Sequence, residues 1–180
     1  MNHSGGGNPP LGCTWFSAYA RGVESGEILR NGESASALAV GKTRSSLRIL
    51  LVDDEMLIRK LCTRVLRDFG YQTETANDGA AAWKALQGNV YDLLITDNNM
   101  PKVSGVELVK KVRSANMTLP VILVSGDLPM GELDRNPWLR PVTTLAKPFS
   151  GEELFETVES VLREHAMTRE QTESLPICQS

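Results

Sequence analysis

The fold is decided by residues 91–101, YDLLITDNNMP, where a run of aliphatic residues ends at an acid. The apolar residues 93–95 form a short continuous run, which is typical of a strand buried on both faces. Asp97 lies where that strand leaves the sheet, and ligands bind at the carboxyl edge of open parallel sheets. Pro101 disfavours helical geometry at Met100, so the chain stays extended beyond the acid. The stretch predicts a carboxylate at the ligand-binding edge of a parallel sheet.

Strands and helices alternate along the chain from Leu47 onward. Apolar or alternating runs predict five strands, at residues 47–52, 71–76, around 93–95, 120–125 and 142–147. Helical spacing of apolar residues predicts helices at residues 57–69, 79–87, 106–112 and 150–165. A further helix between the last two strands is expected to be short, because Pro137 ends it after about two turns. The predicted fold class is α/β, a doubly wound five-stranded parallel sheet with helices on both faces.

The bulk composition indicates a soluble globular protein. The chain has 180 residues, of which 41% are hydrophobic and 23% charged, with a formal net charge of −3. The weak negative charge and the lack of a long basic run predict no direct binding to nucleic acid or to a membrane. The first residues lack the pattern of a signal peptide, so the cytoplasm is the expected location. The three cysteines are scattered, which favours neither a disulfide framework nor a zinc site.

Composition divides the chain into three parts. Residues 1–46 contain turn-rich stretches such as GGGNPP and show no lasting strand or helical period, so we expect a flexible N-terminal extension. Residues 47–166 carry the alternating strands and helices of one domain. Residues 167–180 are expected to form a flexible C-terminal tail.

Polar residues stand at the ends of several predicted strands. Asp53 and Asp54 follow the first strand, Asp97 the third, Ser125 ends the fourth and Lys147 the fifth. Because the carboxyl ends of parallel strands share one edge, we expect these side chains to converge. Clustered carboxylates repel one another unless a cation neutralises them, and Mg²⁺ suits carboxylate and carbonyl oxygens. An acid nucleophile beside a divalent cation, an ammonium and a hydroxyl is suited to phosphoryl transfer.

Each of these residues also has a structural interpretation. An aspartate after a strand often caps a helix, and a serine at a strand end is often a turn residue. It is their joint occurrence, each at a strand end, that favours a functional site over coincidence.

The segment 47–166 resembles the receiver domain of two-component response regulators. The resemblance is carried by the motifs LLVDDE, LLITDNNMP, VILVSGD and LAKPF, at residues 50–55, 93–101, 121–127 and 145–149. It implies a flavodoxin-like fold in which Asp97 accepts a phosphoryl group from a phosphohistidine. The donor would be a sensor histidine kinase or a histidine phosphotransfer protein. The resemblance also implies Mg²⁺ or Mn²⁺ bound by Asp53, Asp54, Asp97 and the main-chain carbonyl of Asn99.

The same resemblance assigns roles to residues near the last two strands. Ser125 would hydrogen-bond a phosphoryl oxygen, and Lys147 would pair with the phosphoryl group. The Lys147–Pro148 bond is expected to be cis, as it is in the family. Asp127 and Asn99 would flank the path of the water that hydrolyses the aspartyl phosphate, which predicts a short-lived phosphorylated state.

One position departs from the family pattern. Thr144 stands where many members carry a switch tyrosine or phenylalanine. Together with the short fourth helix, this indicates that the signal is read out differently here.

The main hypothesis is a single-domain response regulator that phosphorylates and dephosphorylates only itself and signals to an unknown downstream protein. A phosphorelay or phosphate-sink receiver without output is the alternative within this class. A phosphohydrolase of the haloacid dehalogenase type is an alternative from another class, but Asn99 stands where such enzymes need their second acid. A receiver-like adaptor that is never phosphorylated is a third, and the full set of polar residues argues against it.

Overall fold

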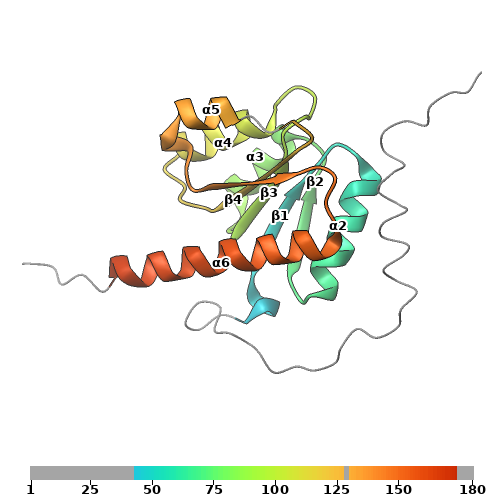
Figure 1. The fold of residues 1–180 in the computed structure, drawn as a ribbon, viewed down its shortest axis with the longest axis horizontal. Coiled ribbons are helices and arrows are strands. Elements are labelled where there is room, and N and C mark those ends of the chain that lie inside the picture. The colour runs from blue at the N-terminus through green and yellow to red at the C-terminus, as the bar shows by residue number, and fades with distance from the viewer. Residues whose placement is uncertain (1–42, 128–129, 174–180) are drawn as a thin grey trace, which may run out of the picture.

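The computed structural model describes residues 43–127 and 130–173. Their elements follow one another in the order η2 (Arg44–Ser46), β1 (Arg48–Val52), α2 (Met56–Asp68), β2 (Gln72–Ala76), α3 (Gly79–Gly88), β3 (Leu93–Asp97), α4 (Gly105–Ser114), β4 (Val121–Ser125), α5 (Met130–Arg135), η3 (Pro137–Leu139), β5 (Val142–Ala146) and α6 (Gly151–Glu173) (Figure 1).

The strands form one five-stranded sheet in the order β2-β1-β3-β4-β5. Every neighbouring pair is parallel, as the alternation of strands and helices predicts. Strand order reverses beside β1, which leads to β2 on one side and pairs with β3 on the other. The carboxyl ends of β1 and β3 therefore lie side by side at the switch point of a doubly wound sheet, where ligands bind in such folds. The predicted fold class is confirmed.

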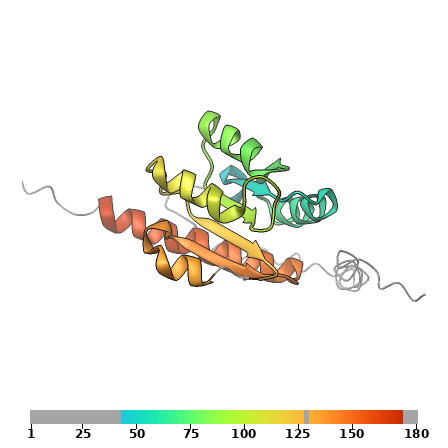
Figure 2. The ribbon, with the colours of Figure 1, turned by 90° about the horizontal axis from the view of Figure 1, so that it is seen from above.

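The two faces of the sheet are covered by different helices (Figure 2). Alternate residues of β1, such as Leu50 and Val52, pack in one apolar cluster with side chains of α3, α4 and α5. Their neighbours Ile49 and Leu51 pack on the other face with α2 and α6. Successive strand side chains point to opposite faces, so a strand covered on both faces is apolar throughout.

Several helix ends follow their sequence signals. The Asp78 side chain accepts a hydrogen bond from an α3 main-chain N–H, and Gly70 ends α2 with a φ of +92°. Ser150 and Glu153 form the expected reciprocal pair of hydrogen bonds at the start of α6. The prediction for Leu57 is wrong. Helical spacing of apolar residues places it on the packed face of α2, but its side chain is 68% exposed.

The fourth helix is short, as predicted. Helix α5 has six residues and ends before Pro137, which instead begins the single turn η3. Pro129, the expected first residue of this helix, lies outside the described residues.

The described structure reaches beyond the domain limits expected from sequence at both ends. Arg44, in η2, forms an ion pair with Glu159 of α6 at 2.9 Å and lies over the Phe155 ring. Helix α6 continues to Glu173, past the expected end of the domain at residue 166. The division into a domain and two flexible ends otherwise stays a prediction.

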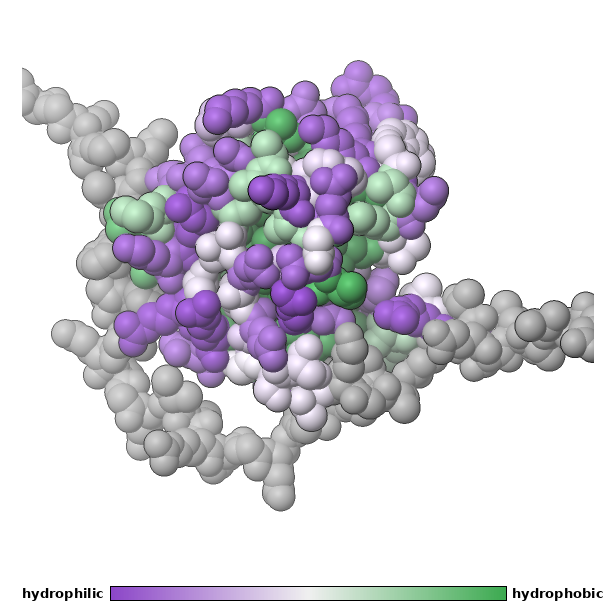
Figure 3. Space-filling model, turned by 180° about the vertical axis from the view of Figure 1, so that it is seen from behind, coloured by the Kyte–Doolittle hydropathy of each residue, from purple (hydrophilic) through white to green (hydrophobic). Residues whose placement is uncertain are grey.

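The surface carries few large exposed apolar side chains among the described residues. Figure 3 shows apolar residues in small areas among hydrophilic ones on the face drawn there. In the part of the chain that the structure describes, every helix is too short or too polar to cross a membrane.

Candidate functional site

Three carboxylates gather at the carboxyl edge of the sheet. Asp53 directly follows β1, Asp54 is its neighbour, and Asp97 is the last residue of β3. One oxygen from each lies within 4.8 Å of the others. Asp53 and Asp97 are buried, at 3% and 5% exposure, whereas Asp54 is exposed. The three acids therefore converge at this edge of the sheet, as predicted.

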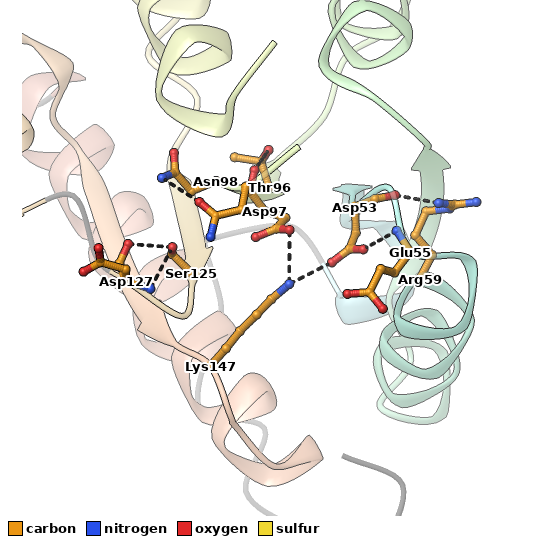
Figure 4. A network of polar contacts seen from close by, with 10 residues as sticks. Asp53, Glu55, Arg59, Thr96, Asp97, Asn98, Ser125, Asp127 and Lys147 are labelled. Atoms are coloured by element: carbon orange, nitrogen blue, oxygen red, sulfur yellow. Dashed lines mark hydrogen bonds and ion pairs between the residues drawn. The ribbon is translucent and has the colours of Figure 1, made fainter. Parts of the chain in front are cut away.

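Lys147 connects the two buried acids (Figure 4). Its Nζ lies 3.3 Å from Asp53 Oδ2 and 3.2 Å from Asp97 Oδ2, and its side chain is only 14% exposed. Burial alone would lower the pKa of Lys147, but the two carboxylates outweigh that effect and raise it. The ammonium offsets part of the negative charge of the two acids. The Lys147–Pro148 bond is cis, as expected.

Asp53 is held by its own loop and by helix α2. Its Oδ1 accepts a hydrogen bond from the Glu55 main-chain N–H at 2.8 Å. Its main-chain carbonyl accepts a hydrogen bond from Arg59 Nη1 at 2.6 Å. Burial raises the pKa of the Asp53 carboxyl, and the attraction of Lys147 opposes that rise. The arrangement therefore fixes a carboxylate that would gain from a further positive charge.

Asp97 differs from Asp53 in having a free oxygen. Its Oδ1 is buried and has no hydrogen-bond partner among the described residues. Buried carboxylate oxygens are normally paired, so an orphaned one marks a place for a ligand. The next residue, Asn98, fixes the loop: its side-chain Oδ1 accepts from the Val106 N–H at 3.2 Å, and its carbonyl accepts from the Gly105 N–H.

Gly105 allows the start of α4 to approach this loop. A Cβ at residue 105 would lie 2.5 Å from the Asp97 carbonyl oxygen and 2.7 Å from a methyl group of Leu123. A glycine is therefore required here by close packing, and the sequence pattern alone did not identify it.

Ser125 lies at the same edge but is not free. It is fully buried; its hydroxyl donates to the Asp127 carbonyl at 2.7 Å and accepts from the Asp127 N–H at 3.2 Å. The Lys147 main-chain N–H donates to the Ser125 carbonyl at 2.8 Å, which ties the ends of β4 and β5 together. The hydroxyl must turn away from Asp127 before it can donate to a ligand.

The remaining predicted residues lie around this centre. Asn99 is exposed beside the acids, and Thr144 is half-buried in β5 and pairs with Leu123 of β4. Arg59 and Gly105 were missed by sequence reasoning. An arginine six residues after an acid gives no signal of its own, because half-exposed helix positions commonly carry one.

The donor set fits a small hard cation. Carboxylate oxygens of three aspartates lie within 4.8 Å of one another. Mg²⁺ prefers such oxygen ligands, takes a few of them from protein and keeps several waters, for which the exposed Asp54 leaves one side open.

Comparison with known proteins matches residues 49–159 to the family described as the response regulator receiver domain. The chemotaxis protein CheY of Pseudomonas aeruginosa is 31% identical over 118 residues, covering 64% of this chain and 95% of that protein. The sensor histidine kinase RcsC of Salmonella typhi is 34% identical over 139 residues, covering 76% of this chain and 15% of the kinase. The chain spans half or less of the length of several curated relatives that it matches.

A solved structure shows the same fold. The response regulator protein TrrA of Thermotoga maritima, crystallised in complex with Mg²⁺–BeF, is 34% identical. The match covers 64% of this chain and 98% of that one, with a TM-score of 0.57.

Proposed function

This chain belongs to the response regulator receiver domains of two-component signalling, and on that premise we propose that Asp97 accepts a phosphoryl group from a phosphohistidine. The donor is a sensor histidine kinase or a histidine phosphotransfer protein. The chain then signals through contacts with other proteins.

The observation that carries this proposal is the unpartnered oxygen of Asp97. Oδ1 is buried and unpartnered within the described residues, while Oδ2 of the same carboxylate is paired with Lys147 at 3.2 Å. A nucleophile needs a free lone pair and a fixed direction, and this carboxylate has both. Asp53 has no unengaged oxygen, because each of its two carboxylate oxygens accepts a hydrogen bond.

The reaction forms one bond and breaks one. Oδ1 of Asp97 attacks phosphorus, the P–O bond forms, and the P–N bond to the donor histidine breaks with its electron pair going to the imidazole nitrogen. Lys147, already within ion-pair distance of the acid, pairs with the negative phosphoryl oxygens as they arrive. The Ser125 hydroxyl exchanges its bond to the Asp127 carbonyl for a bond to a phosphoryl oxygen.

Asp53, Asp54, Asp97 and the main-chain carbonyl of Asn99 would hold Mg²⁺ or Mn²⁺. When bound, the cation offsets the repulsion between the acids and the incoming phosphoryl group. The family resemblance assigns these ligands, and the cluster of carboxylate oxygens within 4.8 Å supports three of them.

The region around α5 and β5 departs from the family pattern in two ways. Thr144 replaces the aromatic switch residue of many receivers, and α5 has only six residues. We infer that a partner protein contacts the ends of β4 and β5, which are joined by the hydrogen bond between Lys147 and Ser125. This contact would take the place of a rotating aromatic side chain in transmitting the signal.

The test is phosphorylation of the full chain by an acyl phosphate and by a phosphohistidine donor. Intact-mass spectrometry should detect one added phosphoryl group in the presence of Mg²⁺ and none in the presence of a chelator. Asp97→Asn should abolish the modification. Asp134→Asn is the matched control, since its carboxylate is 65% exposed on α5 and makes only a 3.9 Å ion pair. Undiminished labelling of Asp97→Asn would refute the proposal.

A further inference from the structure

We propose that Arg59 is a positioning residue of the cation site, because its guanidinium fixes the main chain of Asp53 and thereby aims the Asp53 carboxylate at the metal. The inference rests on the proposed function, since it assumes that Asp53 binds the cation.

Arg59 spans the link between β1 and α2. Its Nη1 donates to the Asp53 carbonyl at 2.6 Å, and its main-chain N–H donates to the Glu55 carbonyl at 3.0 Å. The side chain thus reaches back from the first turn of the helix to the residue that directly follows the strand (Figure 4). One arginine holds both ends of the segment 53–55.

The conformation of this segment decides where the Asp53 carboxylate points. Oδ1 accepts from the Glu55 N–H at 2.8 Å, so the carboxylate is tied to the same three residues whose main chain Arg59 holds. Oδ2 is left facing Lys147 and the other acids. A change in the main-chain torsions of residues 53–54 would displace the Glu55 N–H from Oδ1 and remove the hydrogen bond that orients the carboxylate.

The effect is one of geometry more than of charge. The cation that pairs with the Asp53 carboxylate is Lys147, whose Nζ lies 3.3 Å from Oδ2. Arg59 donates to a neutral carbonyl, and hydrogen bonds of an arginine to main-chain carbonyls restrain a loop without changing its net charge.

Helix α2 contains a natural control. Arg67, two turns further along, also donates from its guanidinium to a main-chain carbonyl, that of Thr73, at 3.1 Å. Thr73 lies near the start of β2, at the other end of the sheet from the acids. Loss of either arginine removes one hydrogen bond of the same kind, but only Arg59 adjoins the cation site.

The experiment uses the full chain and needs no phosphorylation. Mg²⁺ is titrated into wild type, Arg59→Gln, Arg59→Lys and Arg67→Gln, and amide NMR shifts give the dissociation constants. Loss of a group that hydrogen-bonds to a ligating residue typically weakens metal affinity 10- to 100-fold, so Arg59→Gln should weaken Mg²⁺ binding about tenfold. Arg59→Lys, which keeps a donor, should recover part of that loss, and Arg67→Gln should bind as wild type does.

A second measurement is made without metal. Hydrogen exchange of the Glu55 amide, which donates to Asp53, should be faster in Arg59→Gln than in wild type and unchanged in Arg67→Gln. Urea unfolding should show similar losses of stability in the two glutamine variants.

The outcomes separate the two proposals. If wild type shows no Mg²⁺ binding, the proposed cation site is wrong and the role of Arg59 falls with it. If wild type binds Mg²⁺ and Arg59→Gln binds it equally well, only the positioning role is overturned. Equal weakening in Arg59→Gln and Arg67→Gln would also overturn it, because a general loss of stability would then be the cause.

Discussion

Replacement of Lys147 by methionine should destabilise the protein without metal and make it depend on Mg²⁺. Lys147 Nζ lies within 3.3 Å of carboxylate oxygens of Asp53 and Asp97, and all three side chains are at most 14% exposed. Methionine keeps most of the volume and removes the charge, which leaves two buried carboxylates facing each other. Removing one partner of a buried ion pair costs about 3–5 kcal/mol.

The lower end of that range applies here, because the site lies at the sheet edge beside the exposed Asp54. A loss of about 3 kcal/mol corresponds to a melting temperature lower by about 12 °C, at about 4 °C per kcal/mol for a domain of this size. Mg²⁺ at tenfold its dissociation constant stabilises the bound state by about 1.4 kcal/mol. The gain should be larger in Lys147→Met, because the ammonium no longer competes for the same oxygens.

The loss of stability in Lys147→Met should also depend on pH. Burial raises the pKa of Asp53, and removing Lys147 takes away the attraction that limits that rise. A carboxyl with a higher pKa in the folded state binds more protons when folded, so stability falls as the pH rises through that pKa. The difference between variant and wild type should therefore be small near about pH 4 and should grow toward neutral pH.

The assay is thermal unfolding followed by circular dichroism, with and without Mg²⁺, at several pH values. Lys110→Met is the control, since it loses an ion pair to Glu132 at 2.6 Å in which both side chains are more than a third exposed. Such surface pairs contribute at most about 1 kcal/mol, and no Mg²⁺ effect is expected. The reasoning is refuted if Lys147→Met melts as wild type does without metal, or if Mg²⁺ stabilises both proteins equally.

Three further predictions concern other parts of the chain. Gly105→Ala should cost about 1–3 kcal/mol in urea unfolding and weaken Mg²⁺ binding, because its Cβ would meet the main chain of Asp97 and Asn98. Arg44→Ala should lower the free energy of unfolding by about 1 kcal/mol, because its ion pair to α6 and its contact with an aromatic ring are lost. Unchanged stability would show that η2 does not contribute to the domain. Asn99→Met and Asp127→Leu, followed by phosphoryl decay after removal of the donor, should each slow hydrolysis, and unchanged rates would exclude both side chains from the water path.

The positions of the site residues could be predicted because they follow from the topology of the sheet. Once the strands are known to be parallel, residues that end β1, β3, β4 and β5 must share one edge, whatever the details of packing. That argument places Asp53, Asp97, Ser125 and Lys147 correctly before any contact is known.

Contacts that depend on the reach of a single side chain could not be predicted in this way. Arg59 and Arg67 are alike in the sequence pattern of α2, and only the path of the chain after β1 brings the first of them to Asp53. Leu57 satisfies helical spacing but is exposed, and the buried side chain of that turn is the neighbouring Ile58. Arg44 was assigned to a flexible segment, since one ion pair and one ring contact produce no periodic signal.

The groups that the proposed reaction requires are not equally available in the structure. Lys147 is engaged by two acids, and the Ser125 hydroxyl is engaged by the Asp127 carbonyl, whereas Asp97 Oδ1 is unpartnered within the described residues. A phosphoryl group on Asp97 offers both engaged groups a more strongly charged acceptor than the ones they leave. Because the Lys147 N–H is bonded to the Ser125 carbonyl, a shift at either residue moves the ends of β4 and β5 together. The proposed chemistry would thus change the shape of this edge without an aromatic switch at position 144.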